Sequence, residues 1–66
     1  MRAEDIVWVR NNILLLTTSR RFEPGELQMI FDIYNRITGE NKRPTSCARC
    51  VTGVSKTIIN TYNKQV

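Results

Sequence analysis

The chain has 66 residues, of which 41% are hydrophobic and 24% are charged, and its net charge is +4. This length excludes an ordinary multidomain enzyme, because so short a chain buries only about 60% of the surface that it exposes when unfolded. The composition excludes a disordered chain, which would be poorer in apolar residues and richer in charge. We therefore expect a single domain over residues 1–66, which a partner helps to stabilise.

The charge is unevenly distributed along the chain. Residues 1–41 carry five basic and six acidic side chains, a net charge of −1, and residues 42–66 carry five basic side chains and no acidic one, a net charge of +5. The five basic residues of the second segment are Lys42, Arg43, Arg49, Lys56 and Lys64. A basic segment of this kind is typical of a protein that binds nucleic acid or an acidic partner, although it also serves solubility.

The sequence predicts no membrane span and no secretory signal. Its longest apolar run, Ile13 to Leu16, is much shorter than the about 18 residues that a transmembrane helix needs. Glu4 and Asp5 precede the first apolar stretch, and no small-residue cleavage site follows it. We expect a cytoplasmic protein that binds no membrane.

The apolar spacing predicts a first helix from about Ala3 to Thr17, although a strand over residues 12–18 is an alternative. Four residues at three- and four-residue intervals form its predicted core face: Ile6, Val9, Ile13 and Leu16. Four more apolar residues lie on the opposite side or between the two sides: Trp8, Leu15, Val7 and Leu14. A helix that is apolar nearly all round is either central or covered on two sides. Residues 17–21 break the pattern and read as a loop.

A second helix is predicted to begin near Pro24, which the first turn tolerates, with Glu23 and Glu26 at the positive end of the helix dipole. Its stop is Gly39, which can adopt the left-handed conformation. The predicted buried stripe is Leu27, Ile30, Ile33, Tyr34 and Ile37, with Met29 and Phe31 at its flanks.

A third helix is predicted to follow Pro44, with Thr45 or Ser46 as its cap. One face is predicted to be buried and carries Cys47, Val51, Val54, Ile58 and Tyr62. The opposite face is predicted to be exposed and carries Arg49, Lys56, Asn60 and Lys64. The predicted fold is therefore all-α, a small three-helix bundle.

The chain offers little catalytic chemistry. It has no histidine, the commonest general base, and its three glycines stand too far apart for a phosphate-binding loop. We explain Glu23 and Glu26 by the helix dipole, not as a catalytic pair. We predict that the protein is not an enzyme and uses no cofactor.

Cys47 and Cys50 form a Cys-x-x-Cys pair at a predicted helix start, beside Arg43 and Arg49, a setting that lowers the pKa of a thiol. Three interpretations stay open: ordinary packing, a zinc site shared across a dimer or completed by carboxylates, and a redox role. We predict reduced, metal-free thiols, with Cys47 packed against Val51 and Val54.

The stretch from Tyr34 to Val51, which ends in Thr-Ser-Cys-x-x-Cys-Val, resembles short proteins of tailed bacteriophages and prophages of gut Bacteroidetes. The resemblance covers little more than a quarter of the chain. It implies a phage protein of the host cytoplasm or the virion, either a virion accessory part or a small host-takeover factor.

We expect a non-enzymatic accessory protein that docks on a larger protein assembly or on a second copy of itself. The predicted contact residues are the surplus apolar residues of the first helix: Trp8, Leu15, Val7 and Leu14. The alternative is a nucleic-acid-binding or transcription-modulating factor that uses the basic residues from Lys42 to Lys64. A helix-turn-helix fits this alternative poorly, because the loop before the third helix is longer than the three or four residues usual for that motif.

Overall fold

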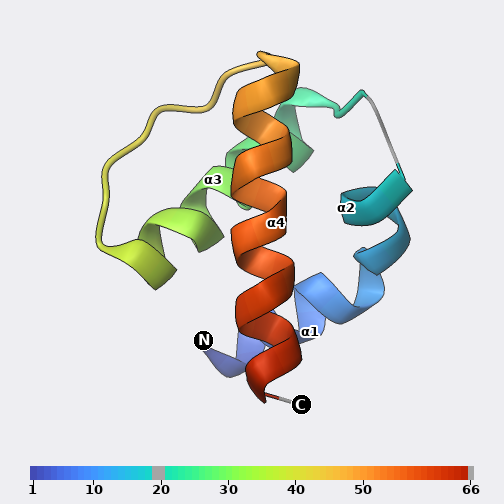
Figure 1. Cartoon of the computed structure of the whole chain (residues 1–66), viewed down its shortest axis with the longest axis vertical. Helices are drawn as coiled ribbons and strands as arrows, with labels where there is room; N and C mark the ends of the chain where they lie inside the picture. The colour runs from blue at the N-terminus through green and yellow to red at the C-terminus, as the bar shows by residue number, and fades with distance from the viewer. Residues whose placement is uncertain (19–20, 66) are drawn as a thin grey trace.

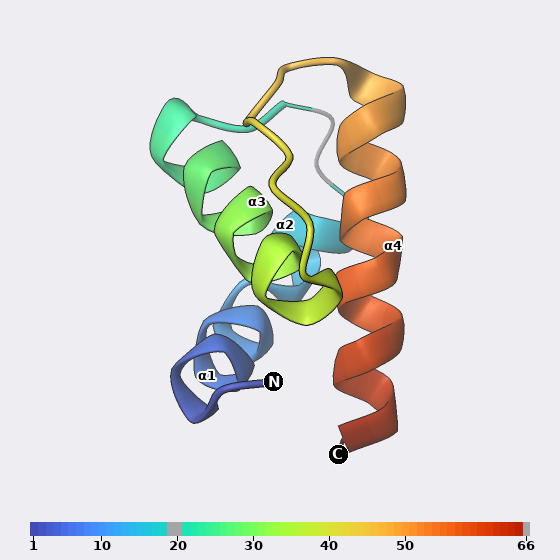
Figure 2. The same ribbon diagram turned by 90° about the vertical axis from the view of Figure 1, so that its left-hand side faces the viewer.

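A computed structural model describes residues 1–18 and 21–65 of the chain. This part of the chain folds into four α-helices and contains no strand. The helices are α1 (Ala3–Asn11), α2 (Ile13–Thr18), α3 (Pro24–Thr38) and α4 (Ala48–Gln65). The all-α class is thus confirmed, whereas the described residues form four helices where three were predicted. α4 stands in front of the other helices in Figure 1, and Figure 2 shows α1, α2 and α3 all on one side of it.

The prediction of one continuous first helix is wrong, because the helix is interrupted at Asn12. The side-chain amide of Asn12 donates a hydrogen bond to the carbonyl of Trp8 at 2.8 Å. Its backbone N–H donates to the carbonyls of both Trp8 and Val9, at 3.0 and 3.1 Å. An Asn side chain that binds a nearby carbonyl competes with the helical pattern and favours a helix end. The carbonyl of Asn12 then accepts the first bond of α2, from the N–H of Leu16.

The predicted loop after the first helix begins later than expected. Thr17 and Thr18 belong to α2, and each hydroxyl donates to the carbonyl of a residue one turn earlier. Ser19 and Arg20, which were also assigned to this loop, lie outside the described residues.

Both ends of α3 agree with the prediction. Pro24 occupies the first turn, and the backbone N–H of Glu23 donates to Glu26 Oε1 at 2.8 Å. Glu26 therefore satisfies a free backbone donor at the helix start, in addition to its favourable position in the helix dipole. At the other end Gly39 is left-handed, with φ of 76°, and its N–H donates to the carbonyl of Asn35 at 2.8 Å.

The segment between α3 and α4 is fastened to α3 through Lys42. The side chain of Asn35 donates to the carbonyl of Lys42 and accepts from its N–H, at 2.9 and 3.0 Å. The ammonium group of Lys42 lies 5.1 Å from the centroid of the Tyr34 ring. At the end of this segment, Thr45 Oγ1 accepts from the N–H of Cys47, and the carbonyl of Cys47 accepts the first bond of α4.

The core lies between α4 and the three other helices. Its buried apolar residues are Val9, Leu16, Ile30, Phe31, Ile33, Val51, Val54 and Ile58. Most of these were predicted, but Phe31, expected at a flank, is fully buried. Cys47 is exposed, so its predicted place on the buried face is wrong. The physical reason is that α4 begins after Cys47, which is therefore not on the helical repeat that places Val51 and Val54 in the core.

Candidate functional site

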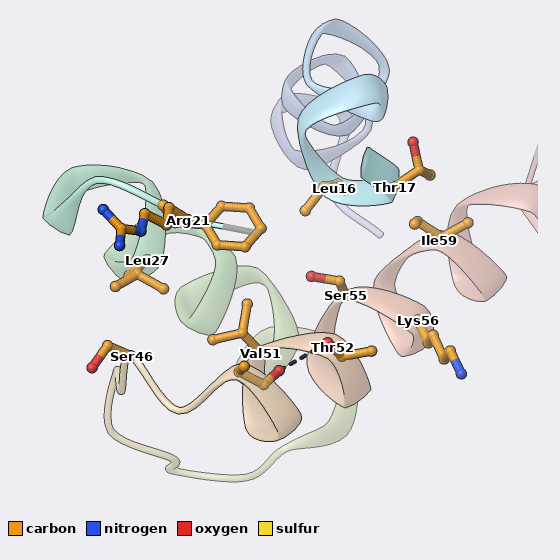
Figure 3. A pocket seen from close by; sticks show the side chains of 12 residues that line it. Leu16, Thr17, Arg21, Leu27, Ser46, Val51, Thr52, Ser55, Lys56 and Ile59 are labelled. Carbon is orange, nitrogen blue, oxygen red and sulfur yellow. Dashed lines mark hydrogen bonds between the residues drawn. The ribbon is translucent and has the colours of Figure 1, made fainter. Parts of the chain in front are cut away.

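A pocket of about 880 Å³ opens between α2, the start of α3 and residues 48–59 of α4 (Figure 3). Its volume is within the range of sites that bind ligands or the side chains of a partner. Most of its wall is apolar and comes from elements that are distant in sequence. The apolar lining residues are Leu16, Phe22, Leu27, Ala48, Val51 and Ile59. We refer to this pocket as the α2–α4 groove.

The hydroxyl group of Ser55 is the unusual polar feature of the groove. Ser55 is only 4% exposed, and its Oγ has no hydrogen-bond partner among the described residues. In Figure 3 this oxygen points toward the interior of the groove. A buried hydroxyl without a partner costs about 1–3 kcal/mol, and most buried polar groups in folded proteins are satisfied. Such a group is therefore a natural contact point for something that enters the groove.

Three threonine hydroxyls of α4 donate a hydrogen bond to the backbone of the helix, which the hydroxyl of Ser55 does not do within the described residues. The hydroxyls of Thr52, Thr57 and Thr61 each donate to the carbonyl four residues earlier, at distances of 2.8, 3.2 and 2.9 Å. The hydroxyl of Ser55 makes no corresponding bond to the carbonyl of Val51 within the described part of the chain. The hydrogen-bonding capacity of the Ser55 hydroxyl is therefore not used by the described part of the chain.

The charge at the groove has one sign. Arg21 and Lys56 are both exposed and both contribute to its lining. Among the described residues no carboxylate lines the groove, and neither cation forms an ion pair with a carboxylate. Two unpaired cations beside an apolar wall favour an occupant that is apolar on one side and acidic at its edges.

The four predicted partner-binding residues of the first helix differ in how far they are buried. Trp8 is half-buried and packs against the core, so the expectation that it has no internal partner is wrong. Leu15 is also half-buried, whereas Val7 and Leu14 are 44% and 73% exposed. These four residues do not line the groove, to which α2 contributes Leu16 and Thr17 instead. Their contact with a partner stays a prediction.

The five predicted basic residues, Lys42, Arg43, Arg49, Lys56 and Lys64, are all exposed. Lys42 and Arg43 lie in the segment before α4, whereas the other three are spaced along α4. Lys42 is engaged with Tyr34, and Lys56 lines the groove. Binding of nucleic acid by these residues stays a prediction.

Cys47 and Cys50 are exposed free cysteines at the start of α4. The predicted packing of Cys47 against Val51 and Val54 is therefore wrong. The two neighbouring thiols change each other's pKa: hydrogen bonding between them is the largest cause that lowers the pKa of Cys47 and raises that of Cys50. The described residues include no group of three or more His, Cys, Asp or Glu side chains that could hold a metal ion.

Ser55 is not among the predicted site residues, although the sequence contains a signal for it. Ser55 follows Val51 by four residues and precedes Ile59 by four, so all three positions share one side of a helix. Both neighbours line the groove with it. A single hydroxyl within an apolar helix stripe is a pattern that can be found without a structure.

Comparisons of the chain with protein-family models, with curated proteins and with solved structures find no match. None of the helices over residues 3–18, 24–38 and 48–65 has both the length and the apolar character needed to cross a membrane.

Proposed function

We propose that this protein is a non-enzymatic docking module, whose α2–α4 groove receives an amphipathic helical segment of a larger protein assembly. The observation that carries the proposal is the hydroxyl of Ser55, which is buried and has no partner among the described residues, beside the apolar wall of the groove. A bound segment would offer Ser55 an acceptor or donor and would cover the apolar wall. The resemblance of residues 34–51 to short phage proteins supports a tailed-phage accessory protein of the host cytoplasm or the virion as the setting.

The chemistry of the groove defines the occupant. An amphipathic helix presents apolar side chains at intervals of three and four residues, which suits a groove walled by Leu16, Val51 and Ile59. One polar side chain within that apolar face would meet Ser55. Acidic side chains at its edges would face Arg21 and Lys56, which have no carboxylate partner within the described residues.

A non-enzymatic role fits the side chains around Ser55. A serine nucleophile needs a neighbouring base, most often a histidine held by a carboxylate. The chain has no histidine, and among the described residues no carboxylate lines the groove. Ser55 is thus suited to hydrogen bonding rather than to acyl transfer.

Two synthetic peptides test the proposal directly. Both would be amphipathic helices with the same apolar face and one central Gln, and they would differ only in carrying Glu or Lys along the polar edges. We expect the acidic peptide to shift the amide NMR signals of Val51, Ser55 and Ile59 and to bind at least about fivefold more tightly than the basic one. Lys56→Glu should weaken this binding.

Lys64→Glu is the matched control for that variant. It makes the same charge change at an exposed position of the same helix, but Lys64 does not line the groove. Equal binding of the two peptides, equal effects of the two variants, or shifts confined to residues outside the groove would each contradict the proposal.

Nucleic-acid binding is the second candidate function, and one observation favours it. The side of α4 that faces away from α1–α3 is open in Figure 2, and Arg49, Lys56 and Lys64 are exposed on a helix that carries no acidic residue. Duplex DNA would then bind with an affinity that falls steeply with salt. Arg49→Glu with Lys56→Glu should abolish this binding, whereas Arg2→Glu with Arg10→Glu, at exposed positions of the N-terminal segment, should have a smaller effect. No binding by the parent chain at low salt removes this candidate.

A further inference from the structure

The two cysteines lie at the start of the longest helix in the described part of the chain, with Cys47 directly before α4 and Cys50 in its first turn. The carbonyl of Cys47 accepts the first hydrogen bond of α4, and Cys50 follows three residues later, inside the first turn. Both side chains are exposed. A thiol at this position is close to the unpaired N–H groups and to the positive end of the helix dipole, which favour the thiolate form.

The two thiols are not equivalent. The hydrogen bond from Cys50 is the main cause that lowers the pKa of Cys47, and the same bond is the main cause that raises the pKa of Cys50. Of the two thiols, Cys47 is therefore the more readily ionised, and it also lies nearer the amino-terminal end of α4. One reactive and one resolving thiol is the arrangement that exchange between dithiol and disulfide requires.

The alternatives fit the structure less well. Structural packing does not account for the pair, because neither side chain is buried. A structural zinc ion needs four ligands, and the described part of one chain brings no third His, Cys, Asp or Glu to the two sulfurs. A disulfide needs only these two sulfurs, and the bond from the N–H of Val51 to the carbonyl of Cys47 closes one turn that holds both cysteines.

We propose that Cys47 and Cys50 form a redox-active dithiol, which closes to an intramolecular disulfide by exchange with a low-molecular-weight disulfide such as oxidised glutathione. This inference goes beyond the proposed docking function. The Cys47 thiolate attacks one sulfur of the small disulfide, whose S–S bond breaks to release one thiolate that takes up a proton. Cys50 then loses its proton to solvent and attacks the sulfur of Cys47, which releases the second small thiol. The protein loses two electrons and two protons, and one disulfide is reduced to two thiols.

The site of this disulfide adjoins the groove. Ser46 and Ala48, the two neighbours of Cys47 in sequence, line the α2–α4 groove (Figure 3). Closing the disulfide would link Cys47 covalently to the first turn of α4 at this edge of the groove. The oxidation state of the pair is thus in a position to alter what the groove binds.

Mass spectrometry of the intact protein in glutathione redox buffers tests the inference. We expect the parent chain to lose two titratable thiols without gaining the mass of glutathione. Cys50→Ser should accumulate a stable mixed disulfide at Cys47, because the resolving thiol is missing. Cys47→Ser should react with oxidised glutathione at least about fivefold more slowly than Cys50→Ser at neutral pH.

Both variants change exposed positions, so helical circular dichroism should be the same as for the parent chain. Equal reaction rates of the two variants, or a parent chain that takes up two glutathiones and forms no internal disulfide, would overturn the proposal. A dimer with one stoichiometric zinc ion and thiols protected from alkylation would overturn it in favour of a four-thiolate site shared by two chains. Because none of these measurements involves a peptide, they are independent of the docking function.

Discussion

Asp5 and Arg36, which lie 31 residues apart in the sequence, form a two-bond ion pair that joins α1 to α3. The guanidinium Nε donates to Asp5 Oδ2 at 2.9 Å, and Nη2 donates to Oδ1 at 2.7 Å. The side chain of Asp5 is 3% exposed and that of Arg36 is 35% exposed. The hydrogen bond from Arg36 to Asp5 raises the pKa of Arg36, so the arginine stays charged at any pH in ordinary use. Planar, two-bond pairs of this kind fix the relative orientation of their elements.

Asp5→Ala should lower the free energy of unfolding by about 1–3 kcal/mol, since it leaves Arg36 without its partner. The loss falls below that of a fully buried pair, because solvent can still reach the guanidinium group. Glu4→Ala is the control, as Glu4 is an exposed acid in the same first turn of α1. Urea unfolding of the two variants and of Arg36→Ala measures the difference. Equal stability of the Asp5 and Glu4 variants would show that the pair contributes nothing.

Replacement of Gly39 and of Gly53 by alanine should change the free energy of unfolding in opposite directions. Gly39 has a φ of 76°, and Gly53 lies in the interior of α4; a Cβ at either position would meet no atom within 4 Å. Gly39→Ala should therefore destabilise the protein through backbone strain, by about 1 kcal/mol. Gly53→Ala should stabilise it by about 0.5–1 kcal/mol, because alanine favours the helix. Thermal unfolding measures both, and a shift of the same sign for the two variants would contradict the placement of Gly39 at the helix end.

How much of the fold is predictable depends on the range of the interactions. The start of α3 at Pro24 and its end at Gly39 follow from local backbone preferences, so the sequence alone predicts both. The interruption at Asn12 is also local, but it depends on which carbonyl one amide side chain binds, and periodicity does not report this. The pairing of Asp5 with Arg36 depends on how α1 meets α3, which no local pattern encodes.

The same distinction applies to the candidate site. The predicted apolar stripe of α4 includes Val51 and Ile58, and both residues are buried. The groove beside this stripe was not predicted, because its other wall comes from α2 and the start of α3. The exposure of Cys47 was missed because the helical repeat was extended past the true start of α4.

Ser55→Ala should raise the free energy of unfolding of the isolated protein by about 1 kcal/mol, since it removes a buried hydroxyl that has no partner within the described residues. Thr57→Ala is the matched control on the same helix. The hydroxyl of Thr57 donates to the carbonyl of Gly53, so its removal should bring no comparable gain. Chemical denaturation of the two variants decides the matter. A loss of stability in Ser55→Ala would mean that the hydroxyl is satisfied in solution.

Substitution of Trp8 and of Leu14 by serine should distinguish a residue that packs against the core from one that is exposed to solvent. Trp8→Ser should lower the free energy of unfolding by about 2–4 kcal/mol, because the indole packs against the core. Leu14→Ser should change it by less than about 0.5 kcal/mol, since Leu14 is 73% exposed. If Leu14 contacts a partner, Leu14→Ser should weaken assembly while leaving helical circular dichroism unchanged. A strongly destabilised Leu14 variant would mean that this residue is covered within the monomer.

The contacts of α4 with all three other helices have a consequence for the biosynthesis of the protein. α1, α2 and α3 all pack on α4, which follows them in the chain. A ribosome therefore completes three helices before it makes α4, whose Val51, Val54 and Ile58 share one core with Phe31, Ile30 and Val9. Until the residues of α4 have left the ribosome, these apolar side chains stay open to solvent or to a chaperone. Folding of the domain is thus delayed until nearly all of it has been translated, and arrest of translation between Gly39 and Cys47 would leave a chain without its core.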